Sequence, residues 1–145
     1  MADSVSIKIN GLDEVKNLLS NLAPKSAQNI LRNTVYDIAA EVRDEAKDRV
    51  PVDSGNLRSA IKAERRRGTR GSIEASVNVT SGEAAKRDGW YWRFVEFGTR
   101  LKGARPFLLP ASESVAARLD DLLSQLFVAR YDREMARLAK KKARG

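Results

Sequence analysis

Residues 90–111 constrain the fold more than any other part of the chain, because they hold six of its nine aromatic residues. Apolar side chains recur at helical spacing from Tyr91 to Phe94 and Val95. Gly98 then stands where a helix would end in the left-handed conformation that glycine adopts without a Cβ clash. The pattern predicts one or two helical turns that end at Gly98.

An apolar segment between two prolines follows this short helix. Residues 99–105 contain Gly103 and three cations but no apolar period, which predicts an exposed loop. Pro106 and Pro110 then flank residues 107–109, and residues before proline avoid the helical region. We therefore expect an extended apolar peg. Its aromatic member, Phe107, either lies at a subunit interface or fills the chain's own core.

Periodicity elsewhere predicts an α+β fold, with a small antiparallel sheet packed by a long helix and a long C-terminal helix. Residues 5–9 alternate as a strand does, and residues 12–22 show helical spacing up to Pro24. A longer amphipathic helix is predicted from Ser26 to Arg49. Residues 72–80 give the clearest strand. Its inward side chains are Ile73, Ala75, Val77 and Val79, and its outward ones are Glu74, Ser76 and Asn78.

The segments between these elements have the composition of turns and loops. Residues 53–55 predict a turn, and residues 57–60 a helical turn that leads into an extended segment at residues 61–63. Residues 65–71 are expected to form the turn of a hairpin. Residues 81–89 are polar and glycine-flanked, which predicts a loop.

One long C-terminal helix is predicted, with Pro110 in its first turn. Its apolar stripe consists of Val115, Leu119, Leu122, Leu123, Leu126 and Phe127, and continues through Tyr131, Met135 and Leu138. We expect so long a helix to pack its distal half on another subunit or to project, although a disordered tail after Arg130 is the alternative. Residues 1–129 are thus predicted to form one domain, and residues 130–145 a basic helical extension or tail.

Composition excludes several classes of function. The chain has 145 residues, of which 42% are hydrophobic and 32% charged, and no apolar run approaches the roughly 20 residues of a membrane span. No signal peptide is apparent, so we expect synthesis in the cytoplasm. Cysteine and histidine are both absent, which argues against an enzyme, a metal site or a cofactor. The acidic residues Asp37, Glu41, Asp44 and Glu45 alternate with Arg43 and Lys47, which indicates a solvated, paired helix face.

The net charge of +8 is concentrated in two blocks. Residues 62–70 carry five cations and one carboxylate, and residues 128–145 carry seven cations and two carboxylates. Such blocks attract DNA or an acidic protein without reading a base sequence, or they are only solvated. The candidate contact residues are Arg65, Arg66, Arg67, Arg70, Arg130, Arg133, Arg137, Lys140, Lys141 and Arg144.

Two motifs together resemble a known family. One joins residues 96–99 (Glu-Phe-Gly-Thr) to residues 106–111 (Pro-Phe-Leu-Leu-Pro-Ala), and the other is residues 50–61, with Ser54 where threonine is commoner. In this order, and followed by a C-terminal helix, they resemble the tail-completion, or neck, proteins of long-tailed phages. The resemblance covers roughly residues 31–126.

This resemblance implies a small α+β structural subunit of a virion. It would form a homo-oligomeric ring, with six copies favoured and twelve possible, between head-closure and tail-terminator proteins around the DNA passage. The subunit interface would then include Glu96, Phe97, Gly98, Thr99, Arg105, Pro106, Phe107 and Leu108. A basic, non-sequence-specific nucleic-acid-binding protein is the alternative of a different class.

Overall fold

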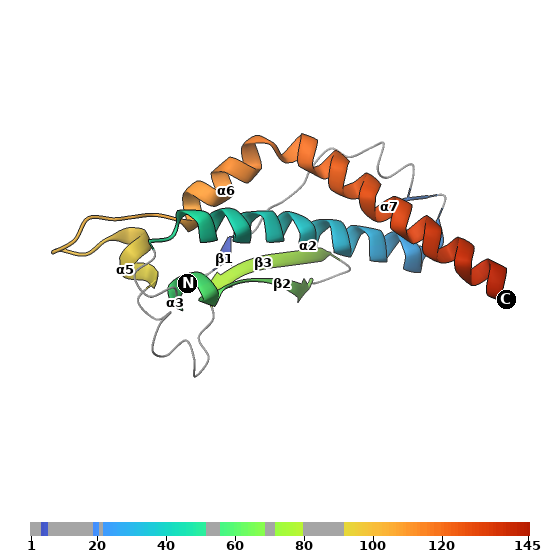
Figure 1. Cartoon of the computed structure of the whole chain (residues 1–145), viewed down its shortest axis with the longest axis horizontal. Coiled ribbons are helices and arrows are strands. Elements are labelled where there is room, and N and C mark those ends of the chain that lie inside the picture. Colours follow the sequence, from blue (N-terminus) through green and yellow to red (C-terminus); the bar gives the residue numbers. More distant parts are fainter. Residues whose placement is uncertain (1–3, 6–18, 21, 52–55, 69–71, 80–91) are drawn as a thin grey trace.

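The structure is a computed structural model that describes residues 4–5, 19–20, 22–51, 56–68, 72–79 and 92–145. A central helix, α2 (Pro24–Arg49), separates a small sheet from two C-terminal helices, α6 (Leu108–Ala117) and α7 (Leu119–Arg144) (Figure 1). This arrangement confirms the predicted α+β class.

Helix α2 confirms the long helix predicted from Ser26 to Arg49 and begins two residues earlier. Pro24 occupies the first turn, where its missing N–H is harmless. At the other end, Val50 adopts an extended conformation immediately before Pro51, as the proline requires. The buried stripe of α2 consists of Ser26, Ile30, Thr34, Ile38, Ala39, Val42 and Ala46. This stripe lets α2 pack against the sheet and against α6 and α7.

The sheet has the order β1-β3-β2 and is antiparallel throughout. Its strands are β1 (Ser4–Val5), β2 (Ile61–Arg67) and β3 (Ile73–Val79), and the short helix α3 (Asn56–Ala60) leads directly into β2. The pairing of β2 with β3 runs from Ile61 opposite Val79 to Arg67 opposite Ile73. Residues 65–67 were predicted to form the hairpin turn, and this was wrong because strand pairing continues through all three.

Strand β3 follows the predicted alternation except at Ser76. This residue was predicted to face outward, but it is only 2% exposed. Strand β3 is the middle strand and is paired on both sides, so a small side chain on its outer face has little access to solvent. The Ser76 hydroxyl also accepts a hydrogen bond from Asn78 Nδ2 at 3.1 Å.

Helix α7 confirms the predicted long C-terminal helix, but the expectation that this helix starts at Pro110 was wrong, because residues 108–117 form a separate helix, α6. Arg118 lies between them with φ −116° and ψ 23°, and the chain bends there so that α6 and α7 both reach α2 (Figure 1). Helix α7 runs without interruption from Leu119 to Arg144 and passes through the expected boundary at residue 130. Residues after Arg130 are thus helical, as the main expectation had it, and the alternative of a disordered tail is wrong.

The apolar peg was predicted to be extended, and this was also wrong. Helix α6 begins at Leu108, so Leu108 and Leu109 belong to its first turn together with Pro110. The restriction that proline places on the preceding residue is a preference, and helix-terminal hydrogen bonds outweigh it here. The predicted turn at residues 53–55, the loop at residues 81–89 and most of the elements predicted over residues 5–9 and 12–22 lie outside the described residues.

Candidate assembly site

The candidate site is built on a short helix, α5 (Trp92–Phe97), and on the loop that follows it. Gly98 adopts φ +77°, and its N–H donates to the Phe94 carbonyl at 2.9 Å, so the predicted helix stop is confirmed. A Cβ at this position would lie 2.7 Å from the Ala104 nitrogen. Glycine is therefore needed at residue 98 for its conformation and for the close approach of the returning chain.

The loop over residues 98–106, here called the cationic loop, is closed by its own hydrogen bonds. The Thr99 N–H donates to the Lys102 carbonyl at 2.8 Å, and the Lys102 N–H donates to Thr99 Oγ1 at 3.0 Å. At the base of the loop, the Arg105 N–H donates to the Val95 carbonyl at 2.8 Å. These bonds hold the loop as a fixed projection beyond the end of α2 (Figure 1).

Glu96 joins the cationic loop to helix α6. Its carboxylate is buried, with the residue 6% exposed, and it accepts three backbone hydrogen bonds. Oε2 accepts the N–H groups of Phe107 at 2.7 Å and Leu108 at 3.0 Å, and Oε1 accepts that of Leu109 at 2.9 Å. Pro110 has no N–H, so every donor from residue 107 to 110 is accounted for. A negative charge at a helix N-terminus is also favoured by the helix dipole.

The two residues after Pro106 lie in the core of the chain itself. Phe107 is 0% exposed and Leu108 is similarly buried, and both belong to the cluster around Val42, Ala46 and Val115. Burial of a phenylalanine side chain stabilises a fold by roughly 1.5–3 kcal/mol. Within one chain Phe107 thus fills the core, the alternative that its sequence context left open, and its side chain is not part of the exposed surface.

Large apolar side chains are exposed around this buried anchor. Phe97 is 71% exposed and Leu101, at the tip of the cationic loop, is 96% exposed. Phe94 and Leu109 are exposed as well, on α5 and in the first turn of α6. These four exposed side chains fall within residues 94–109 of the chain, and exposed large apolar side chains in one region are of the kind that marks protein interaction sites.

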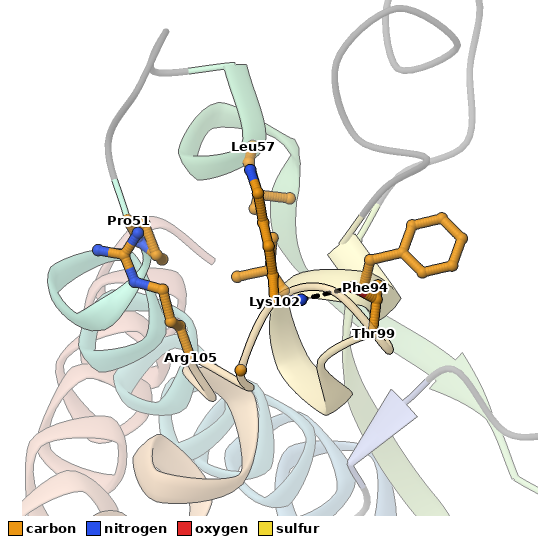
Figure 2. Close-up of a pocket in the computed structure, with 8 residues that line it drawn as sticks. Pro51, Leu57, Phe94, Thr99, Lys102 and Arg105 are labelled. Carbon is orange, nitrogen blue, oxygen red and sulfur yellow. Dashed lines mark hydrogen bonds between the residues drawn. The ribbon is translucent and has the colours of Figure 1, made fainter.

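A pocket of about 280 Å³ lies beside the cationic loop. Its apolar walls come from Pro51, Leu57 and Val95, and Lys102 and Arg105 contribute cationic groups. Figure 2 shows Phe94 and Arg105 on opposite sides of this pocket. The pocket is therefore lined both by an exposed apolar side chain, Phe94, and by two cationic residues of the loop, Lys102 and Arg105.

The basic residues of β2 differ in their surroundings. Arg65 donates from Nη2 to Asn33 Oδ1 at 2.9 Å, and its guanidinium lies 4.2 Å from the centre of the Tyr36 ring. Arg65 is thus held against α2 although it is exposed, whereas no such contact with α2 is seen for the equally exposed Arg66 and Arg67 among the described residues. The fourth predicted contact residue of this block, Arg70, lies outside the described residues.

The basic residues of α7 also divide into two groups. Arg130 forms a bidentate ion pair with Asp37 of α2, with nitrogen–oxygen distances of 2.6 and 2.7 Å. This carboxylate raises the pKa of Arg130. Arg137 pairs with Glu134 at 2.5 Å, and the resulting hydrogen bond lowers the pKa of the buried Glu134.

The remaining predicted contact residues of α7 are exposed. These residues are Arg133, Lys140, Lys141 and Arg144. The predicted stripe of six cations is thus interrupted, because Arg130 and Arg137 have carboxylate partners in the same chain. The positive charge without such partners concentrates in the last turns of α7.

The acidic face of α2 takes part in the same packing. Arg118, at the bend between α6 and α7, pairs with Glu45 and lies 3.6 Å from Glu41. Burial of Glu45 acts to raise its pKa, but hydrogen bonds from Ser114 and Arg118 outweigh burial and lower the pKa. These carboxylates thus have structural partners, as their alternation with cations indicated. Among the described residues no cluster of three metal-ligating side chains occurs.

Sequence patterns did not predict two features of the site. The first is the role of Glu96 at the start of α6, because its partners lie 11 to 13 residues further along the chain. The second is the pocket, because Pro51 and Leu57 reach it only through the tertiary fold. The signal nearest to both was the pair of motifs around residues 50–61 and 96–111, since the pocket lies where they meet.

None of the described helices is long and apolar enough to cross a membrane.

Comparison with known proteins gives one match. The family model described as "Bacteriophage HK97-gp10, putative tail-component" matches residues 13–98, which is more than half of the chain. No curated protein and no solved structure matches the chain. The matched region includes α2, α3, strands β2 and β3, and α5, and it ends at the glycine that terminates α5.

Proposed function

Because the chain belongs to the HK97-gp10-like family of bacteriophage tail components, we propose that it is a ring-forming subunit of the phage neck. Membership of this family makes it a structural protein and not an enzyme. In the proposed role it joins the head connector to the tail and surrounds the DNA passage. Its neighbours are head-closure and tail-terminator proteins, with six copies favoured in the ring and twelve as the alternative.

The observation that carries this proposal is the exposed apolar surface around α5 and the cationic loop. Phe97 and Leu101 are far more exposed than is usual for side chains of their type. Phe97 ends α5 and Leu101 lies in the following loop, and Glu96 and Gly98 fix this region to the core, so the exposure does not result from a poorly packed segment. A fixed apolar projection on a small domain is suited to repeated contact between copies.

Two phenylalanine variants separate assembly from folding. Phe97→Ala removes an exposed ring, so the variant should keep the free energy of unfolding within about 0.5 kcal/mol of the native value and lose assembly. Phe107→Ala, as the matched control, empties a buried site and should lower the free energy of unfolding by about 3–5 kcal/mol. Thermal melts and negative-stain images of assembled particles measure the two effects. Normal assembly with Phe97→Ala would contradict the proposed surface.

The place of the protein in the virion tests the proposal most directly. Phage that lack this protein should accumulate filled heads and separate tails, and its addition should restore joined particles. Antibody labelling in electron micrographs should mark the junction between head and tail. Labelling along the tail tube, or joined particles without the protein, would overturn the neck role and leave a tail component of another position.

A second candidate function is weak contact with the genome through the end of α7. Lys140, Lys141 and Arg144 are exposed, and the described residues near them offer no carboxylate partner in the same chain. Contacts of this kind bind phosphates without choosing a sequence and weaken steeply with salt. Binding of duplex DNA at low salt that disappears near physiological salt would support it, and no binding at low salt would refute it.

A further inference from the structure

We infer that the ring forms when the cationic loop of one copy docks on the bend between α6 and α7 of the next copy. This inference rests on the proposed ring and names the surfaces that form its contact. The second surface, here called the α6–α7 corner, consists of Glu113, Ala116, Ala117, Asp120 and Asp121. It is identified by charge and shape, which complement those of the cationic loop.

The cationic loop has a single sign of charge. Residues 97–106 contain Arg100, Lys102 and Arg105 and no carboxylate. All three cations are exposed, and none forms an ion pair with the residues that the structure describes. Leu101 projects between them at the tip of the loop. The loop therefore needs a partner that offers carboxylates around a flat apolar contact.

The α6–α7 corner offers such a surface. Glu113, Asp120 and Asp121 are exposed, and in the described part of the chain none of them has an ion-pair partner. Ala116 and Ala117 are exposed between them at the end of α6, where small side chains leave room for a leucine. Arg118, the cation within residues 113–121 of the chain, is paired with Glu45 of α2, so its charge already has a carboxylate partner.

The positions of the two surfaces favour a ring over a closed dimer. The cationic loop projects at one end of the molecule, beyond the end of α2, and the α6–α7 corner lies along the side that α6 and α7 cover (Figure 1). A contact between two unlike surfaces leaves one of each unused on the outer copies. Such a contact repeats from copy to copy, and it gives a ring where the rotation between neighbours closes and a helical filament where it does not.

Both surfaces are attached to the same rigid helix. Glu96 fixes the cationic loop to the start of α6, and the ion pair between Arg118 and Glu45 fixes the end of α6 to α2. The loop and the corner thus keep a constant relation to each other within one copy. A symmetric ring has the same rotation between every pair of neighbours, and this requires the two contact surfaces to have the same relative position in every copy.

Cross-linking tests the contact, because the chain contains no cysteine of its own. A chain that carries Leu101→Cys and Ala117→Cys should form disulfide-linked multimers in assembled particles under mild oxidation. The matched control carries Leu101→Cys with Ala139→Cys, an exposed alanine on α7, and should remain monomeric on a denaturing gel. The inferred contact is wrong if only the control pair forms a cross-link, or if neither pair does so in particles that contain a ring. In either case the proposal of a ring would still stand.

Charge reversal gives an independent result where the cysteine variants fail to assemble. Lys102→Glu with Arg105→Glu should lower the yield of joined particles about tenfold or more, because like charges across an interface are strongly unfavourable. Asp120→Lys with Asp121→Lys should have a similar effect. The four changes together should restore much of the yield. If both double variants lower the yield of joined particles but the fourfold variant does not restore it, the proposed contact is wrong. If native particles contain no ring at all, the proposed function is wrong as well.

Discussion

Replacement of Glu96 tests the central feature of the site. Glu96→Ala removes a buried carboxylate that accepts three backbone hydrogen bonds. Glu96→Gln keeps the shape of the side chain but turns one acceptor oxygen into a donor. Glu113→Ala, on the exposed face of α6, is the matched control.

The expected loss follows from the number of bonds. Each net hydrogen bond stabilises a fold by about 0.5–1.5 kcal/mol, and more where the acceptor is charged. Three such bonds place the loss for Glu96→Ala at about 3–5 kcal/mol, with an intermediate loss for Glu96→Gln. This is a large part of the roughly 5–15 kcal/mol that stabilises a typical domain.

Thermal melts followed by circular dichroism measure the effect. A chain of this size loses about 2–4 °C per kcal/mol, so Glu96→Ala should melt roughly 6–20 °C below the native protein. Glu113→Ala should melt within about 2 °C of it. Equal melting temperatures for all three variants and the native protein would refute the assignment of Glu96 as the residue that holds α6 to the loop.

Three further predictions concern the loop and α7. Gly98→Ala should destabilise the fold by about 1–3 kcal/mol because of its positive φ. Gly103→Ala, where an added Cβ meets nothing within 4 Å, should change stability by less than about 0.5 kcal/mol, and equal losses in urea titrations would contradict the argument. The hydrogen bond from Arg137 lowers the pKa of Glu134 below its ordinary 4.5, so the stability it supplies is present above that pH and disappears as the pH falls through the lowered value. Melting temperatures should therefore fall more on acidification for the native protein than for Glu134→Gln, and parallel curves would count against this. Removal of residues 139–145 should preserve the melting temperature and, if these cations contact phosphates, reduce the salt dependence of DNA binding; an unchanged slope would exclude them.

The elements that the sequence predicted correctly are those with a local cause. Helix α2 and strand β3 carry uninterrupted periods, and Gly98 ends α5 because of its own backbone conformation. The family resemblance rested on two motifs in a fixed order and not on composition. The match to the family model confirms it. The helix, the strand and the helix stop depend on neighbours within one or two turns of the chain.

The errors share a different cause, which is dependence on residues far away in sequence. The start of α6 at Leu108 is stabilised by Glu96, and no local rule around Pro106 and Pro110 includes that carboxylate. Helix α7 stays ordered beyond Arg130 partly because Asp37, 93 residues earlier, pairs with it. The burial of Ser76 follows from the place of β3 in the middle of the sheet. Tertiary partners of this kind leave no periodic signal.

The attachment of the cationic loop to α6 through Glu96 bears on the angular precision of assembly. In the ring proposed above, an error in the angle between two neighbours would recur at every interface, so the last copy would meet the first only if each error is small. A loop fixed by three backbone hydrogen bonds at the start of a helix has little freedom to tilt. A loop free to tilt would still contact its neighbour but would give open arcs and spirals in place of closed rings. We therefore expect Glu96 variants that still fold to assemble into such open forms.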